Sequence, residues 1–131
     1  MKLLIDNNLP PSMGRGLGEL FRKQHEIIHI KDKFGTGSLP DEQWIKELGK
    51  EGNWSVLSGD MRIAKKKPSR QVFLNNNLVG FFPAPSIMKL EFTKKVARVL
   101  YLWEVIEQQS KLVDRGCFEL PMRSTTLRQI A

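Results

Sequence analysis

Short apolar runs alternate with helix-like segments along most of this chain, and this alternation restricts its fold more than any other feature. The runs are Leu3–Ile5, Glu26–Ile30, Trp54–Leu57 and Leu78–Phe82. In the segments between them, apolar residues recur at three- and four-residue spacing, as they do on one face of an α-helix. Strands that alternate with helices predict an α/β fold, a three-layer α/β/α sandwich around a mostly parallel sheet.

Prolines and glycines mark the ends of the expected helices. Proline fits the first turn of a helix, where its missing N–H group is not needed, so Pro10 and Pro11 begin the first helix. Ser86 has the side chain of a good N-cap, whereas Pro68 interrupts a helical hydrogen-bond ladder. The segment Phe34–Ser38 is expected to be a loop. The expected helices run from Pro10 or Pro11 to about Phe21, from Ser38 or Leu39 to Gly49, from Asp60 to Pro68, and from Ser86 to about Gln109.

No repeat and no linker-like segment divides the 131 residues, so we expect a single domain over residues 1–131. A chain of this length buries enough surface to fold without a disulfide or a structural metal. The core of the domain is expected to span about residues 1–110. Residues 111–131 then form a C-terminal extension, in which Gly116–Leu120 and Leu127–Ile130 are possible edge strands.

Neither apolar stretch of the chain suits a membrane or a secretory signal. Asp6 interrupts the N-terminal run too early for a signal peptide. The stretch Ile87–Leu112 is too polar to span a bilayer, since it contains Lys94, Lys95, Arg98, Glu104 and Glu107. Cys117 is the only cysteine, so no disulfide framework exists. We therefore expect a cytoplasmic protein with no membrane association.

The net charge of +7 is concentrated in one part of the chain. Nine Lys or Arg residues lie between Gly59 and Arg98, and only Asp60 and Glu91 oppose them. A local excess of positive charge attracts polyanions, above all nucleic acid. It also suits a solvated surface, or a surface that docks an acidic partner protein. The residues expected to bind nucleic acid are Arg62, Lys65, Lys66, Lys67 and Arg70.

Three aspartates from separate elements are expected to converge. Asp6 and Asp60 each follow a predicted strand, and the carboxyl ends of neighbouring parallel strands meet at one edge of a sheet. Asp41 lies at the start of the helix between them. Like charges brought together repel unless a cation joins them, and Mg²⁺ takes oxygen ligands. A bound ion of this kind activates water and neutralises charge that develops on a phosphate.

Each of these acids also has a structural interpretation. Asp6 or Asp60 alone, after a strand, is commonly a turn residue or a helix cap. Asp41 and Glu42 could simply complement the dipole at the start of their helix.

The histidines and tryptophans fit structural roles better than functional ones. His25 and His29 have the spacing of a metal pair, but no third ligand accompanies them. Trp44, Trp54 and Trp103 each lie on an apolar stripe, so we expect them in the core.

Three segments carry a resemblance to a known family. They are KLLIDNNLPP at residues 2–11, HEIIHIKDKFGTGSLPDEQW at residues 25–44 and SVLSGDMRI at residues 55–63. In this order and spacing the chain resembles the PIN-like domain family, which includes small prokaryotic VapC-type toxins that are encoded with an antitoxin. The resemblance covers about the first 65 residues and extends less distinctly through the long helix.

The resemblance implies an endoribonuclease that depends on Mg²⁺ or Mn²⁺ and is built on a Rossmann-like parallel sheet. It also implies the toxin of a type II toxin–antitoxin pair, with RNA and an antitoxin protein as partners. A homodimer is compatible with this assignment. The family's first acid falls on Asp6, with Asn8 in a D-x-N pattern, and its third on Asp60. Its helix acid falls on Asp41, with Glu42 beside it as a second choice.

The chain departs from the family in one respect. PIN nucleases typically have a fourth acid after the third, yet no Asp or Glu occurs from Met61 to Leu90. Three carboxylates more easily hold one metal than two, so catalysis could be weak or lost. Two alternatives to the ribonuclease follow: a non-catalytic nucleic-acid-binding module, and an interaction domain that docks an acidic partner.

Overall fold

The computed structural model describes all residues, 1–131, in six strands and eight helices. In chain order these are β1 (Lys2–Ile5), α1 (Pro11–Leu20), β2 (Glu26–His29), α2 (Ile30–Phe34), α3 (Asp41–Glu51), β3 (Trp54–Leu57), α4 (Arg62–Lys65), α5 (Lys67–Asn75), β4 (Val79–Pro83), α6 (Pro85–Met88), α7 (Phe92–Tyr101), α8 (Trp103–Leu112), β5 (Gly116–Leu120) and β6 (Arg128–Gln129). One sheet contains all strands in the order β2-β1-β3-β4-β5-β6, and only β6 is antiparallel to its neighbour. The predicted α/β class is confirmed.

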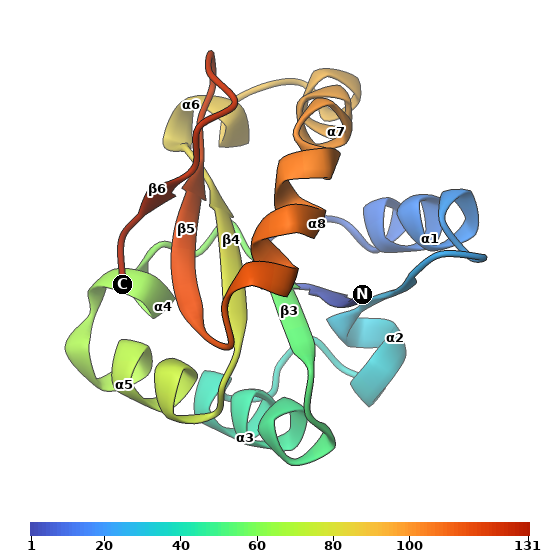
Figure 1. Cartoon of the computed structure of the whole chain (residues 1–131). Coiled ribbons are helices and arrows are strands. Elements are labelled where there is room, and N and C mark those ends of the chain that lie inside the picture. Colours follow the sequence, from blue (N-terminus) through green and yellow to red (C-terminus); the bar gives the residue numbers. More distant parts are fainter.

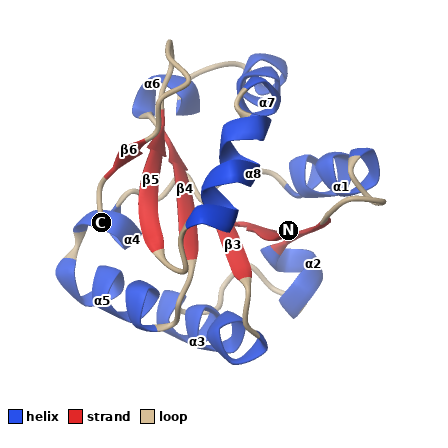
Figure 2. Cartoon of the chain, in the orientation of Figure 1, coloured by secondary structure: helices blue, strands red, loops and turns tan.

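Helices cover both faces of this sheet (Figures 1 and 2). One apolar core lies between the sheet and α1, α6, α7 and α8, and a second lies between the sheet and α2 to α5. Side chains alternate between the two cores along β1: Leu3 and Ile5 belong to the first, and Leu4 belongs to the second. The three-layer α/β/α sandwich expected from the sequence is therefore confirmed.

The strands read as nearly continuous apolar runs because both faces of the sheet are buried. All residues of β3 and β4 are buried, which leaves no position for a solvated side chain. In β4, Gly80 lies where a β-carbon would collide with the rings of Phe73 and Phe82. Cys117 of β5 is also fully buried, and burial raises the pKa of its thiol to about 12.

The strand order places a topological switch point between β1 and β3. The chain leaves β1 for β2 on one side and then returns to form β3 on the other side. The two connections use opposite faces, because α1 packs in the first core and α2 and α3 pack in the second. In open parallel sheets, ligands bind beyond the carboxyl ends of the strands at such a point.

Several expected helix boundaries were wrong. Pro68 does not end a helix but lies in the first turn of α5, where a missing N–H group is tolerated. Extended backbone at Lys66 separates α4 from α5. The helix expected from Ser86 to Gln109 is three helices, α6 to α8, interrupted at residues 89–91 and at Leu102. Its N-cap is Ala84 rather than Ser86, with Pro85 at the first helical position.

The second strand is one residue shorter than expected, because Ile30 begins the unexpected helix α2. The His29 side chain caps this helix by accepting the Lys31 N–H at 3.1 Å. Phe34, expected in a loop, is the last residue of α2. The next helix starts later than expected, at Asp41, with Pro40 at its N-cap.

The C-terminal residues extend the sheet. The prediction of edge strands there holds for β6 but is wrong for β5, which pairs with β4 over five residues on one side and with β6 on the other. Phe118 and Leu120 complete the first core, so the core extends beyond residue 110. None of the eight helices combines the length and the hydrophobicity that crossing a membrane would require.

Candidate acidic metal site

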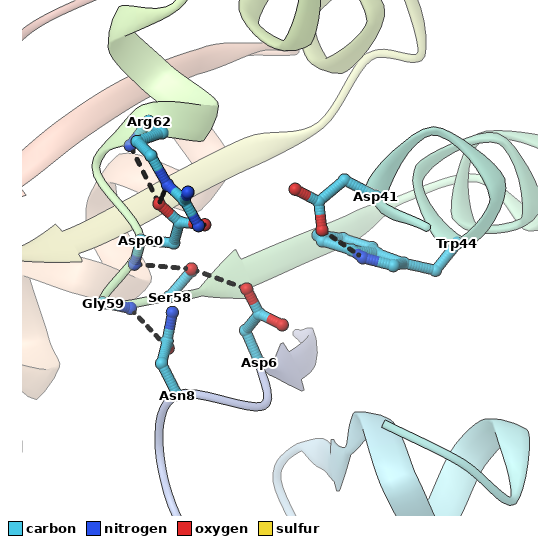
Figure 3. A network of polar contacts seen from close by, with 8 residues as sticks. All are labelled: Asp6, Asn8, Asp41, Trp44, Ser58, Gly59, Asp60 and Arg62. Atoms are coloured by element: carbon cyan, nitrogen blue, oxygen red, sulfur yellow. Dashed lines mark hydrogen bonds and ion pairs between the residues drawn. The ribbon is translucent and has the colours of Figure 1, made fainter. Parts of the chain in front are cut away.

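Asp6 is the buried acid at the switch point and is only 6% exposed. Its backbone N–H donates to the Leu57 carbonyl at 2.9 Å, which continues the pairing of β1 with β3. Its Oδ1 accepts the Asn7 N–H at 2.7 Å. Its Oδ2 accepts the Ser58 hydroxyl at 2.7 Å, a bond drawn in Figure 3. These bonds fix the carboxylate at the end of β1.

Asp60 lies on the loop that follows β3, and Ser58 connects it to Asp6. The Asp60 N–H donates to Ser58 Oγ at 3.0 Å, so a single hydroxyl bonds to both strand ends. The Asp60 side chain forms a bidentate ion pair with Arg62, with Nε to Oδ1 at 2.9 Å and Nη2 to Oδ2 at 3.0 Å. This guanidinium holds the pKa of Asp60 below its usual value.

Asp41 lies in the same region, on one of the helices that pack in the second core. It is the first residue of α3, and its Oδ1 accepts the indole N–H of Trp44 at 3.1 Å. Trp44 is buried in the second core, so a fixed donor orients this carboxylate. Figure 3 shows Asp41 across open space from Asp6 and Asp60.

The three aspartates line one pocket of about 260 Å³. Asp6 and Asp60 lie at the same edge of the sheet, as the sequence predicted. Burial raises the pKa of Asp6, and the charges of Asp41 and Asp60 raise it further, although hydrogen bonds from Ser58 and Asn7 act in the opposite direction. The pocket therefore concentrates negative charge that a bound cation would neutralise.

The donor set of this pocket fits a hydrated Mg²⁺ or Mn²⁺ ion. The carboxylates offer hard oxygen ligands, and the volume admits several waters at about 30 Å³ each. No three Asp, Glu, His or Cys side chains are arranged closely enough to hold an ion directly together. Mg²⁺ commonly keeps several of its waters and binds proteins through one or two carboxylates, so waters can bridge the remaining distance.

The other predicted site residues lie in different positions. Asn8 lines the pocket, but its Oδ1 accepts the Gly59 N–H at 2.8 Å and so holds the loop that carries Asp60. Glu42 does not line the pocket and is paired with Lys46 at the exposed start of α3. Asn7, which sequence reasoning did not select, is exposed and lines the pocket. The sequence feature that could have identified Asn7 as a pocket residue is its position directly after Asp6.

The predicted basic residues occupy α4, the connection that follows it and α5. Lys65, Lys66 and Lys67 are exposed, and the charge of Lys66 acts on Asp60. Arg70 is half-buried, and its charge acts on the buried Cys117. Arg98, farther along the positively charged part of the chain, donates hydrogen bonds to the carbonyls of Pro121 and Ser124.

Both histidines form hydrogen bonds within the chain. His29 is buried, and its Nε2 donates to the Leu9 carbonyl at 2.7 Å while its Nδ1 accepts the Lys31 N–H. His25 bonds through Nε2 to Glu107 at 2.8 Å. Phe21, His25 and Trp103 form an aromatic cluster, in which the rings of Phe21 and Trp103 stack with centroids 4.4 Å apart.

The sheet is open and mostly parallel, and aspartates line a pocket at its switch point. The chain is therefore an α/β protein with an acidic site at the carboxyl edge of its sheet. The sequence model of the family described as PIN like domain matches residues 1–84, a segment that includes β1 to β4 and every acid of the pocket. The chain therefore belongs to the PIN-like domain family. PIN domains are generally nucleases, bind nucleic acid and use divalent metal ions. No curated protein and no solved structure shows a significant match to this chain.

Proposed function

We propose that the protein is an endoribonuclease that depends on Mg²⁺ or Mn²⁺, with Asp6, Asp41 and Asp60 as the metal-binding residues. One observation carries the proposal: three carboxylates from separate elements line a single pocket at the switch point of a PIN-like domain. The basic residues that follow Asp60 along the chain provide a surface for a polyanion. We expect one ion rather than two, because no further acid occurs from Met61 to Leu90.

Several residues in and around the pocket have a defined task in this proposal. A bound divalent ion would supply an activated water and neutralise charge on the phosphate. Ser58 orients Asp6 and the loop that carries Asp60, while Asn8 holds the same loop through Gly59. The exposed amide of Asn7 is available to orient water or an RNA phosphate. Lys65, Lys66 and Lys67 would bind the RNA backbone through its phosphates.

Substitution of the acids tests the enzymatic proposal. Asp6→Asn and Asp60→Asn should each reduce Mn²⁺-dependent cleavage of single-stranded RNA by about 100-fold or more, because loss of a ligand removes several kcal/mol of charge stabilisation. RNA affinity without metal should change little. Asp32→Asn is the matched control, since Asp32 is paired with Arg15 between α1 and α2 and lies outside the pocket.

If the wild type binds RNA but cleaves none with either metal, a non-catalytic RNA-binding module replaces the enzyme. The ion pair of Asp60 with Arg62 is the observation that favours this second candidate, because both carboxylate oxygens already have a partner.

For the cellular role, we propose the toxin of a type II toxin–antitoxin pair that acts in the cytoplasm. The resemblance to a family that includes VapC-type toxins supports this role, and the charge of +7 suits an acidic antitoxin. A direct test can decide whether the basic segment Lys65–Lys67 binds RNA or the antitoxin. Changing Lys65, Lys66 and Lys67 together to Ala should lower the salt slope of RNA binding by roughly two units, at about 0.7 per phosphate contact. An unchanged slope with loss of antitoxin binding would make this segment a protein-docking surface.

A further inference from the structure

The Arg62 guanidinium bonds to the two oxygen atoms that Asp60 would present to a metal ion. Its Nε and Nη2 atoms lie 2.9 and 3.0 Å from Asp60 Oδ1 and Oδ2. The charge of Arg62 is also coupled to Asp41 on the other side of the pocket. A guanidinium and a divalent ion therefore compete for one carboxylate, because both need its oxygen atoms.

Little besides Asp60 holds the Arg62 side chain in place. The side chain is 72% exposed, whereas that of Asp60 is 17% exposed. Asp60 is its only side-chain hydrogen-bond partner. Because the guanidinium lies largely in solvent, it can leave Asp60 when another cation competes for the carboxylate.

The loop keeps its shape when this pair opens. Asp60 Oδ1 also accepts the backbone N–H of Arg62 at 3.1 Å, and the Asp60 N–H donates to Ser58. Neither bond involves the guanidinium. Asp60 can therefore exchange one cation for another without rearrangement of the β3–α4 connection.

We propose that Arg62 is a displaceable cation of the acidic pocket: it binds Asp60 when the pocket holds no metal, leaves when a divalent ion binds, and then contacts an RNA phosphate. This inference rests on the metal site of the proposed function. It assigns Arg62 a role different from that of Lys65, Lys66 and Lys67, because only Arg62 exchanges between the pocket and RNA. Arg62 is thus a positioning residue that couples metal binding to RNA binding.

Mn²⁺ affinity measured by electron paramagnetic resonance tests the competition directly. Arg62→Ala should bind Mn²⁺ about three- to tenfold more tightly than wild type, since no guanidinium has to be displaced. Arg15→Ala is the matched control: Arg15 forms an equivalent bidentate pair with Asp32, at 3.0 and 2.9 Å, away from the pocket. Equal tightening in both variants, or none in Arg62→Ala, would overturn the proposal.

A second measurement uses the unmodified protein. In a nuclear magnetic resonance spectrum of the arginine side chains, addition of Mg²⁺ should shift the Nε–H resonance of Arg62. The Nε–H resonance of Arg15 should stay in place. An Arg62 signal that stays fixed while Mg²⁺ binds would show that both cations occupy the site together, and the proposal would be wrong.

Cleavage assays on the same variants separate this inference from the proposed function. Tighter Mn²⁺ binding by Arg62→Ala, without cleavage of RNA by any variant, would support the exchange and contradict the ribonuclease. Cleavage by the wild type with unchanged Mn²⁺ affinity in Arg62→Ala would support the ribonuclease and contradict the exchange.

Discussion

The two ends of the parallel sheet each hold a carboxylate with a shifted pKa, Asp6 and Glu107, and the two shifts are in opposite directions. At the carboxyl end, Asp6 is buried near two further carboxylates, and its pKa is raised by burial and by their charges. At the amino end, His25 bonds to Glu107 beside the stacked rings of Phe21 and Trp103. The bond from His25 holds the pKa of Glu107 below its usual value.

The contrast separates binding from stability within one fold. The bond between His25 and Glu107 and the stacked rings of Phe21 and Trp103 form within the chain, so the amino end contributes to folding without a ligand. The carboxylates at the other end repel one another, and their hydrogen bonds to the chain, together with the ion pair of Asp60 with Arg62, offset part of the cost. Carboxylate charge that the chain compensates only in part is typical of a functional site that binds a cation.

The largest effect on stability should come from the amino end. Trp103 is 6% exposed and stacks on Phe21, so Trp103→Ala should lower the free energy of unfolding by about 3–5 kcal/mol. Chemical denaturation gives this value. Tyr101→Ala is the control on the neighbouring helix: Tyr101 is 69% exposed, so its loss should cost less than about 1 kcal/mol. Equal losses in the two variants would mean that the aromatic cluster does not anchor this end.

A smaller effect, of opposite sign, should come from the carboxyl end. Asp6→Asn should raise the free energy of unfolding by up to about 1 kcal/mol at neutral pH, because it removes a buried charge that its neighbours repel. The folded protein holds the Asp6 proton more tightly than the unfolded chain does. The stability gained from protonation is therefore complete below the unfolded pKa and is lost as pH rises through the folded pKa.

Measured against wild type over pH, the advantage of Asp6→Asn should thus be smallest in acid and grow toward neutral pH. The comparison between variants is needed because Asp60 and Glu107 have lowered pKa values and act in the opposite direction. Asp32→Asn serves as the contrasting case: its lowered pKa arises from Arg15, so this change should not stabilise the protein. A destabilised Asp6→Asn would show that the bond from Ser58 outweighs the repulsion.

Much of the sheet could be predicted because strands buried on both faces need apolar side chains at almost every position. The common edge of Asp6 and Asp60 followed from the same reasoning, since neighbouring parallel strands end together. Helix boundaries were harder to predict. Pro68 is compatible with either end of a helix, and buried Val99, Trp103 and Ile106 keep helical spacing across the break at Leu102.

The finer structure of the site depends on contacts that local sequence does not encode. Asn8 lines the pocket, but its side-chain carbonyl oxygen accepts the N–H of Gly59, which lies 51 positions away in the chain. Asp60 and Arg62 lie two residues apart, yet their pairing depends on the side-chain conformation that each one adopts. The position of β5 between β4 and β6 is likewise a property of the whole sheet.

The burial of Cys117 has a practical consequence for fluorescent labelling of this protein. A thiol with a pKa of about 12, buried on an interior strand, supplies almost no thiolate at neutral pH and should not react with maleimide dyes. A cysteine placed on the exposed stretch after the acidic pocket, for example by Lys66→Cys, would then be the one reactive position on the molecule. A fluorophore attached there could report the arrival of RNA in real time, with the native cysteine left in place.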